Sequence, residues 1–358
     1  MRAGDKRNWE VYPMKKAISM LTAASLVLAL AGCGATATAS SAASSEAAPS
    51  EAAASSEEAQ GDLPVYVVGV CQLVQHEALD AATQGFKDAL TAKAEGKAIV
   101  GFDEQNASGD SANCSTIING FVSSNVDLIL ANATAPLQAA AAATSEIPVL
   151  GTSVTDYATA LEIDDWNGTV GGNVSGTSDL APLDQQAAMI QELFPDAANV
   201  GLLYCSAEPN SVYQCDEMEK FLTDAGYTVA RYAFTDTNDV SSVAQTAADN
   251  SDVIYIPTDN TAASNTEAIA NVVLPAGVPV VAGEEGICKG CGVATLSISY
   301  YDLGYATGEM AAQILFDGAD ISTIPVQYAP QVTKKYNAAN CEQLNITVPD
   351  DYEAIAAD

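Results

Sequence analysis

Positive charge is scarce in this sequence of 358 residues. It has 13 lysine and arginine residues against 46 aspartate and glutamate residues, which gives a formal net charge of −33 at pH 7. Nucleic-acid binding needs a basic face for the phosphates, so this composition disfavours nucleic acid as a partner. Anionic lipid headgroups would also be repelled, so attachment to a membrane would need another device.

The usual marks of catalysis and metal binding are also lacking. The one histidine, His76, excludes histidine-rich metal sites and has no evident nucleophile partner. The sequence contains neither the GxSxG motif of serine hydrolases nor a GxxxxGK[ST] phosphate loop. We therefore expect a protein that is not an enzyme and that has no cofactor or metal.

The cysteines do not form a closed disulfide framework. Eight are present, and seven remain when Cys33 is set aside, which is an odd number. The CKGC motif, Cys288–Cys291, has no second pair at similar spacing to complete a zinc site, and it is the only feature that would support a redox enzyme. We expect a structural disulfide or free thiols here.

No apolar run is long enough to span a bilayer comfortably, which takes about 20 residues. The apolar segment Ala17–Gly32 follows two lysines and ends in small residues, as a secretory signal does. Its last residues and Cys33 read LAGC, which resembles the lipobox of bacterial lipoproteins. We therefore expect residues 1–32 to be a lipoprotein signal peptide and Cys33 to be lipidated.

A low-complexity stretch follows this cysteine. Residues 34–61 are almost all Ala, Ser, Thr, Glu, Gly, Pro and Gln. Such a segment cannot bury enough apolar area to offset the entropy of ordering it. We expect residues 33–61 to be the lipid anchor and a disordered tether, which hold a folded body outside the cytoplasm.

Apolar strands alternate with amphipathic segments through the rest of the chain. Glu77–Ala94, for example, places Leu79, Ala82, Phe86 and Leu90 at helical spacing. Alternation of strands and helices predicts an α/β fold in which a doubly wound parallel sheet is buried on both faces.

The pattern restarts about halfway along the chain. Asn125–Ala141 has a counterpart in Asn250–Ala270, and IPVLGTS at Ile147–Ser153 is echoed by VPVVAGE at Val278–Glu284. The offset is too long for a solenoid repeat and fits a duplicated α/β lobe. Between the halves, the Gly- and Asn-rich Asp164–Asp179 suits a hinge crossover.

The order of these motifs resembles a known family. GVCQLVQHEALDAATQGFKDAL, ANATAPLQAA, NVSGTSD, YIPTDNTAAS and VAGEEG are similar to motifs of bacterial ABC-transporter substrate-binding lipoproteins of the type I periplasmic-binding-protein fold. Within them, the chain is most similar to the group associated with tryptophan, tyrosine and phenylalanine uptake. The resemblance implies two doubly wound parallel-sheet lobes joined by a three-strand hinge, with an ABC permease and an ATPase as partners.

The resemblance also implies how the body divides. Three crossings between the lobes are expected, near residues 165–178, 286–292 and 322–327. The lobes would be formed by residues 64–165 with 292–322 (lobe one) and residues 175–288 with 326–358 (lobe two).

Ligands of open α/β sheets bind beyond the carboxyl ends of the strands. Three strand ends in each half carry polar residues directly after an apolar strand, and we expect the lobes to close around a small ligand between them. The candidate ligand-binding residues are Gln72, His76, Asn132, Ala133, Thr134, Ser153 and Val154 in lobe one, and Tyr204, Ser206, Asn210, Asp259, Asn260 and Glu284 in lobe two.

This set suits the zwitterion of an aromatic amino acid. Amides and hydroxyls at Asn132–Thr134 and Ser153 would bind the carboxylate, while Asp259, or Glu284 as second choice, would bind the ammonium group. Tyr204, Tyr213 and Tyr300 are the candidates to contact the ring. Alternatively, the aspartate and the asparagine only cap the helices that follow them.

The predicted function is capture of an aromatic amino acid outside the cell and delivery to the permease. Two alternatives stay open, namely a sugar- or nucleoside-binding lipoprotein of the same fold and a ligand sensor without transport. The six strand ends carry no arginine, which weighs against a sugar.

Overall fold

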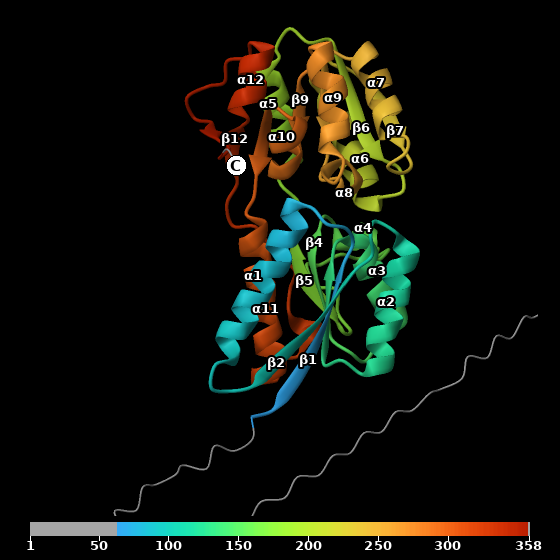
Figure 1. Cartoon of the computed structure of the whole chain (residues 1–358), viewed down its shortest axis with the longest axis vertical. Coiled ribbons are helices and arrows are strands. Elements are labelled where there is room, and N and C mark those ends of the chain that lie inside the picture. Colours follow the sequence, from blue (N-terminus) through green and yellow to red (C-terminus); the bar gives the residue numbers. More distant parts are fainter. Residues whose placement is uncertain (1–62, 357–358) are drawn as a thin grey trace, which may run out of the picture. The chain divides into compact units, whose positions relative to one another are not determined.

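The computed structural model describes residues 63–356, which form two α/β lobes, each built around its own sheet (Figure 1). The expected signal peptide, Cys33 and the tether lie outside the described residues. The predicted fold class, two α/β lobes with parallel sheets, is confirmed.

The sheet of lobe one has six strands, all parallel, in the order β11-β5-β4-β3-β1-β2. The strands are β1 (Val65–Gln72), β2 (Ile99–Asn106), β3 (Leu128–Asn132), β4 (Val149–Val154), β5 (Val174–Ser178) and β11 (Gln327–Tyr328). The helical segments are α1 (Glu77–Ala94), α2 (Ser111–Ser124), α3 (Thr134–Ala143), α4 (Tyr157–Ala160), α11 (Tyr300–Asp317) and the 3-10 segment η1 (Ile321–Thr323).

The sheet of lobe two has seven strands in the order β13-β12-β10-β9-β8-β6-β7, parallel except for the β10–β12 pair. The strands are β6 (Asn199–Cys205), β7 (Thr228–Phe234), β8 (Val253–Ile256), β9 (Val280–Ala282), β10 (Ala294–Ser297), β12 (Thr333–Tyr336) and β13 (Glu353–Ala354). The helices are α5 (Leu183–Leu193), α6 (Pro209–Asp224), α7 (Val240–Asn250), α8 (Asn260–Ala263), α9 (Thr266–Ala276), α10 (Glu285–Cys291) and α12 (Ala338–Leu344).

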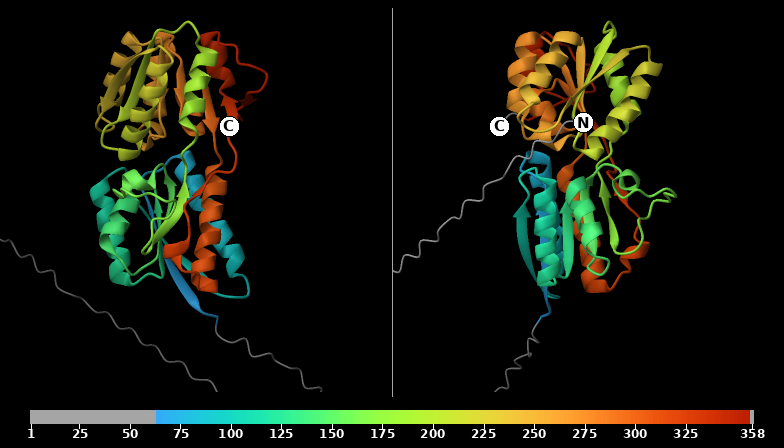
Figure 2. Two further views of the ribbon diagram at one scale, coloured as in Figure 1. Left: turned by 180° about the vertical axis from the view of Figure 1, so that it is seen from behind. Right: turned by 90° about the vertical axis from the view of Figure 1, so that its right-hand side faces the viewer.

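Both faces of each sheet are covered by helices, which can be followed in the two views of Figure 2. On β3, Ile129 belongs to one buried apolar cluster and Leu130 to another, because successive side chains point to opposite faces. Unbroken apolar runs are typical of such doubly covered strands. On α1, the residues placed at helical spacing by the sequence are all buried, as predicted: Leu79, Ala82, Phe86 and Leu90.

Helix α11 follows β10 of lobe two and packs along α1 of lobe one (Figures 1 and 2). Glycines let the two backbones approach closely. A Cβ atom on Gly304 would lie 1.9 Å from the carbonyl oxygen of Ala82, and one on Gly85 would lie 2.1 Å from the carbonyl oxygen of Tyr301. Any larger side chain at these positions would force the two helices apart.

Strand pairing places the crossings later in the chain than the sequence led us to expect. β5 pairs with β4, β10 pairs with β9, and β11 pairs with β5, so Val174–Ser178 and Gln327–Tyr328 lie in lobe one and Ala294–Ser297 lies in lobe two. The three crossings are therefore residues 179–182, 298–299 and 329–332. The difference arises because a short buried strand has the same sequence pattern in either sheet, and only its partners assign it.

The seven cysteines of the described part of the chain are buried free thiols. The CKGC motif lies in α10, where Cys288 and Cys291 are both fully buried and burial raises the pKa of each thiol. Of the two interpretations that the sequence left open, the structure has the free thiols.

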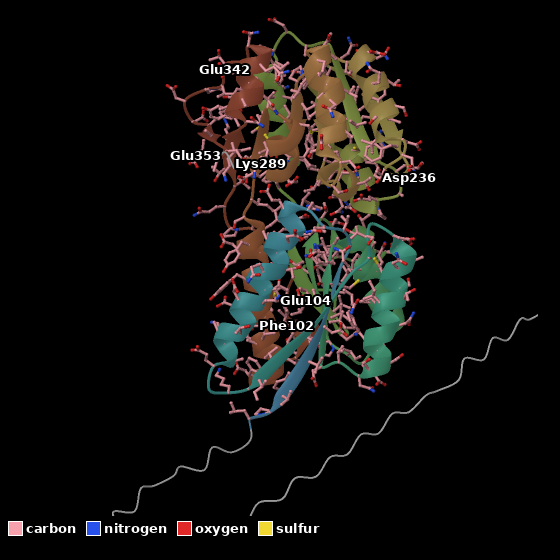
Figure 3. The ribbon with its side chains drawn as sticks, viewed as in Figure 1. Phe102, Glu104, Asp236, Lys289, Glu342 and Glu353 are labelled. Carbon is pink, nitrogen blue, oxygen red and sulfur yellow. The ribbon has the colours of Figure 1, made fainter. Side chains whose placement is uncertain are left out.

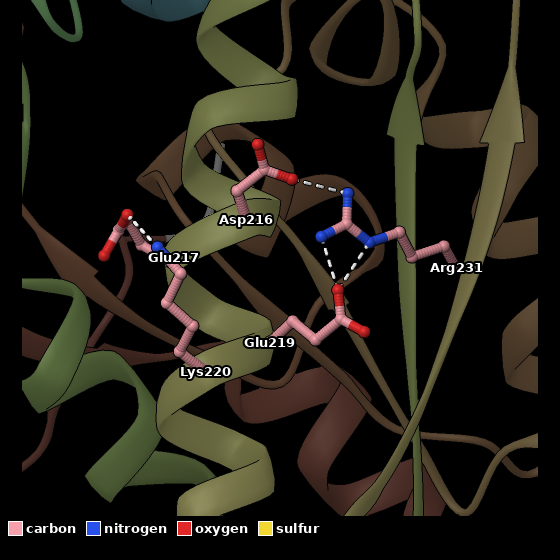
Figure 4. A network of polar contacts seen from close by, with 5 residues as sticks. All are labelled: Asp216, Glu217, Glu219, Lys220 and Arg231. Carbon is pink, nitrogen blue, oxygen red and sulfur yellow. Dashed lines mark hydrogen bonds and ion pairs between the residues drawn. The ribbon is translucent and has the colours of Figure 1, made fainter.

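The few basic side chains pair with the many carboxylates. Arg231 on β7 donates to Asp216 and Glu219 of α6, with an Nη1–Oδ1 distance of 2.7 Å to Asp216, while Lys220 pairs with Glu217 at 2.7 Å on the same helix (Figure 4). These pairs are partly exposed, and each contributes at most about 1 kcal/mol. Of these, only the pairs made by Arg231 join two elements, and they hold α6 beside the edge strand β7.

Candidate ligand-binding site

A narrow cavity of about 10 Å³ lies where the strand ends of the two lobes meet. Binding sites for small organic ligands are commonly about 300–1,000 Å³, so the lobes would have to move apart to admit one. Residues of both lobes line it: His76, Leu79, Ser153, Thr155 and Asp179 from lobe one, Asn210, Thr258, Asp259, Asn260, Ala263 and Glu284 from lobe two, and Tyr300.

In lobe one, polar groups reach the cavity from the ends of β4 and β5. Ser153 has a left-handed backbone conformation, with φ of 55°, and its hydroxyl is buried without a hydrogen-bond partner in the described residues. Strained backbone of this kind is frequent at ligand sites, where the surrounding structure holds it in place.

Asp179 stands directly after β5 and is only 5% exposed. Its Oδ2 accepts a hydrogen bond from the hydroxyl of Tyr300 at 2.8 Å, and the side chain of Thr155 also stabilises the charged carboxyl group. Its Oδ1 is buried and has no partner among residues 63–356. Burial raises the pKa of this carboxyl group, and the hydrogen bonds to its charged form offset part of the rise.

In lobe two, Asp259 caps α8. Its Oδ1 accepts from the backbone N–H of Ala262 at 2.8 Å and its Oδ2 from that of Cys205 at 2.6 Å. Both oxygens are therefore engaged by the backbone. Burial and the neighbouring Glu208 raise the pKa of Asp259.

Glu284 has the same role at the start of α10. Its two oxygens accept from the backbone N–H groups of Gly286, at 2.7 Å, and Ile287. Burial raises the pKa of Glu284 to about 7, although the two amides act in the opposite direction. The carboxylates that the sequence offered for an ammonium group are thus both helix caps.

One contact between the lobes runs through Asn260. Glu208 accepts from the backbone N–H of Asn260 at 3.0 Å and from its Nδ2 at 2.7 Å, which fixes the orientation of the amide. The Oδ1 atom of Asn260 is then left to accept from Nε2 of His76 at 3.2 Å, so this nitrogen carries the proton. Burial lowers the pKa of His76, which favours the neutral imidazole.

Two further contacts join the lobes at the margins of the cavity. Gln214 of α6 donates from Nε2 to Oγ1 of Thr155 at 3.4 Å. On α10, Lys289, labelled in Figure 3, pairs with Glu77 of α1 at 2.7 Å. Ligand groups in the cavity would therefore be enclosed by polar contacts from both lobes.

A sequence model of the family described as ABC transporter substrate binding protein matches residues 67–358. The chain belongs to this family. The resemblance noted from its motifs is confirmed, and with it the type I periplasmic-binding fold.

Individual relatives of this substrate-binding protein are similar in sequence and structure. A tyrosine-binding protein of Clostridioides difficile is 35% identical over 261 residues, 72% of this chain and 75% of that one. A Streptococcus pneumonia ABC domain in complex with L-Trp is 31% identical, covers 81% of this chain and 99% of its own, and has a TM-score of 0.77. A ligand-free, open substrate-binding protein from Clostridium difficile with adhesive properties is 32% identical, with 82% and 100% covered and a TM-score of 0.62.

Substrate-binding proteins of ABC importers work outside the cytoplasm, so this one is extracytoplasmic and binds a small molecule. Within the part of the chain that the structure describes, none of the helices combines the length and the apolar character needed to cross a membrane.

The substrate-binding protein brings six of the thirteen expected site residues to the cavity wall. These are His76, Ser153, Asn210, Asp259, Asn260 and Glu284. The other seven are absent from the wall formed by the described residues: Gln72, Asn132, Ala133, Thr134, Val154, Tyr204 and Ser206.

Most of these seven residues support neighbouring elements. Asn132 donates from Nδ2 to the carbonyl oxygen of Leu79 at 2.8 Å and to Oγ1 of Thr83 at 2.9 Å, and Gln72 accepts from the same threonine at 2.7 Å. These contacts hold the start of α1 against the sheet. In lobe two, Tyr204 is buried in the core, while Ser206 is exposed and donates to a carbonyl oxygen.

Sequence reasoning missed four polar residues of this region, namely Thr155, Asp179, Glu208 and Thr258. The sequence position of Asp179 could have indicated a binding residue, since this aspartate directly follows the buried strand Val174–Ser178. That signal was overlooked because the segment was assigned to a hinge crossover rather than to a strand end of lobe one.

Proposed function

We propose that this protein captures a free aromatic amino acid as its zwitterion between the lobes and delivers it to an ABC permease. The observation that carries the proposal is Asp179, which lines the cavity and whose Oδ1 is buried and has no partner in the described residues. Leaving a buried carboxylate oxygen unpaired is unfavourable by about 1–3 kcal/mol or more. An ammonium group in the cavity would satisfy it.

Asp179 is thus preferred to Asp259 and Glu284 as the partner of the ammonium group. The oxygens of Asp259 and Glu284 already accept hydrogen bonds from backbone N–H groups, whereas Oδ1 of Asp179 has no hydrogen-bond partner in the described residues. A charge-assisted hydrogen bond in a cavity closed to water is about twice as strong as a neutral one.

The ligand carboxylate would bind at Ser153. Its unpaired hydroxyl can donate to an anion, and β4, which carries it, lies beside β3, after which α3 begins. Ala133, the residue before α3, has a φ of 106° and provides no side-chain cap in the described structure, and it lies outside the cavity wall as it stands. Uncapped amides at a helix N-terminus favour an anion.

The side chain of the ligand would lie against Leu79, Ala263 and Tyr300, the apolar and aromatic part of the cavity wall. An aromatic ring packed on Tyr300 gains about 0.5–1.5 kcal/mol beyond area burial. An aromatic ligand is also supported by the relatives described as a tyrosine-binding protein and as a complex with L-Trp.

Delivery completes the proposed function. Residues 1–32 would direct export, Cys33 would carry the lipid that anchors the protein to the cell membrane, and the tether would leave the lobes free to reach the permease, which an ATPase drives. The family supports the transport role. Binding rather than catalysis fits a site whose carboxylates are committed to helix caps and ligand charge.

The test compares Asp179→Asn with the unchanged protein by calorimetry on the purified full chain, refolded to remove carried-over ligand. The ligands are L-tryptophan, L-tyrosine and L-phenylalanine, each paired with its deaminated acid, together with ribose and adenosine. We expect Asp179→Asn to weaken amino-acid binding about 10- to 100-fold, the equivalent of a hydrogen bond to a charged group.

Asp184→Asn is the matched control, because this aspartate follows the same crossing and is exposed. It should leave binding unchanged. No response to any amino acid would refute the proposed function. Binding of ribose or adenosine instead would support the sugar or nucleoside alternative.

A further inference from the structure

We propose that Tyr300 is a positioning residue that makes recognition of the ligand ammonium group depend on the relative placement of two interlobe crossings. The inference rests on the proposed function, because it concerns how Asp179 is presented to the ligand. Asp179 lies at the first crossing, residues 179–182, and Tyr300 follows the second, residues 298–299. The hydrogen bond between them joins segments that are 121 positions apart in the chain.

Packing fixes the ring of Tyr300. It is 7% exposed and belongs to an apolar cluster that also contains Ala78 and Ala82 of α1, Ala181 of the first crossing and Ile298 of the second. The cluster that holds the ring thus combines residues of both crossings and of α1. From this position the hydroxyl of Tyr300 donates to Oδ2 of the aspartate at 2.8 Å.

This bond determines which oxygen of Asp179 is offered to the ligand. The backbone N–H of Asp179 bonds to the carbonyl oxygen of Val154 at 3.2 Å, which holds the residue against β4. With Oδ2 engaged by Tyr300, rotation of the carboxyl group is restricted, and Oδ1 is the oxygen left without a described partner. Preorganisation of this kind strengthens binding because less freedom is lost when the ligand arrives.

Tyr300 lines not only the ligand cavity but also a larger groove of about 940 Å³. That groove is lined by Ser297 and Ile298 next to the second crossing and by Ala329 and Pro330 of the third. Tyr300 and the cap residue Glu284 belong to both hollows. If the crossings bend, this groove would give the ring room to leave the aspartate, and the bond would then form in only one arrangement of the lobes.

The charges around Asp179 make the hydroxyl of Tyr300 important. The titratable groups that face it are Tyr157 and Tyr300, and those across the cavity are His76, Asp259 and Glu284. Among the described residues of the cavity wall there is no lysine or arginine. The carboxylate therefore depends on hydroxyl donors for its stabilisation, and removal of one would raise the pKa of Asp179 further.

The test is Tyr300→Phe, with Tyr301→Phe as the matched control. The hydroxyl of Tyr301 also donates to a carboxylate, Oδ2 of Asp88 at 3.0 Å, but on the exposed side of α1 and away from the cavity. Calorimetry on the full chain uses L-tyrosine and L-tryptophan, each paired with its deaminated acid, from pH 8 to pH 5.

We expect Tyr300→Phe to weaken binding of the amino acids about tenfold at pH 7 while binding of the deaminated acids stays within about twofold. As the pH is lowered, amino-acid affinity should begin to fall at a higher pH than in the unchanged protein. Tyr301→Phe should match the unchanged protein throughout. In an Asp179→Asn background, Tyr300→Phe should add no further loss, because the two residues act through one contact.

Equal losses for the amino acids and the deaminated acids would overturn the inference, and so would an undiminished loss in the Asp179→Asn background. A Tyr300→Phe protein that does not fold would do so too, since the hydroxyl would then be structural. These results differ from failure of the proposed function, in which the unchanged protein binds neither amino acid or does not distinguish them from their deaminated acids.

Discussion

Replacement of Glu284 by glutamine should change how the stability of the protein depends on pH. Glu284 is 3% exposed, and burial raises its pKa from 4.5 to about 7. The hydrogen bonds that its oxygens accept from two backbone N–H groups lower the pKa and offset only part of this rise. In the unfolded chain the same carboxyl group titrates near its ordinary value. The folded protein therefore holds a proton that the unfolded chain has lost between about pH 4.5 and 7.

The sign follows from this difference in bound protons. Because the folded state binds more protons in that window, the free energy of unfolding decreases as the pH rises through it and levels off above the folded pKa. One pKa unit corresponds to about 1.4 kcal/mol, so a rise from 4.5 to about 7 corresponds to about 3 kcal/mol. Glutamine cannot titrate and retains one acceptor for the start of α10, so Glu284→Gln should lack this part of the dependence.

The assay is urea denaturation of the unchanged protein and the variant at several pH values from 4.5 to 8, without ligand. From the lowest to the highest pH, the unchanged protein should lose about 3 kcal/mol more stability than Glu284→Gln. Asp179 and Asp259, whose pKa values are also raised, remain in both proteins, so the difference isolates Glu284. Glu342→Gln, an exposed residue of α12, should follow the unchanged protein. Parallel curves for the unchanged protein and Glu284→Gln would refute the reasoning.

Two other predictions concern the body of the protein. Gly304→Ala should lower the free energy of unfolding by about 3 kcal/mol or more, since its methyl group would lie 1.9 Å from a carbonyl oxygen of α1, whereas Gly120→Ala in α2, with open space around it, should raise it by about 0.5–1 kcal/mol. Equal effects in thermal or urea melts would contradict the close packing of α1 and α11. In a Cys33→Ser protein, Ellman's reagent should label none of the seven buried thiols before unfolding and all seven afterwards. Fewer than seven after unfolding without reductant would indicate a disulfide.

The elements themselves could be predicted from the sequence. Helix Glu77–Ala94 has the predicted bounds, and the two-lobed parallel α/β class followed from strand–helix alternation and its repetition. These features are encoded locally, because the spacing of apolar side chains along a segment determines whether a helix or a strand places them on one buried face. The polar strand ends were equally local, and six of the expected residues do line the cavity.

Only the tertiary structure decided how those pieces are connected. The sequence could not assign β5, β10 and β11 to their sheets, because a short buried strand fits either one until its neighbours are known. It also could not show that Asp259 and Glu284 give their oxygens to backbone amides, while Asp179 keeps one oxygen free beside Tyr300. The composition of the sequence and the order of its motifs thus determined the kind of protein. Which residue is available to bind the ligand depends on hydrogen bonds between positions far apart in the chain, and a local sequence pattern does not contain that information.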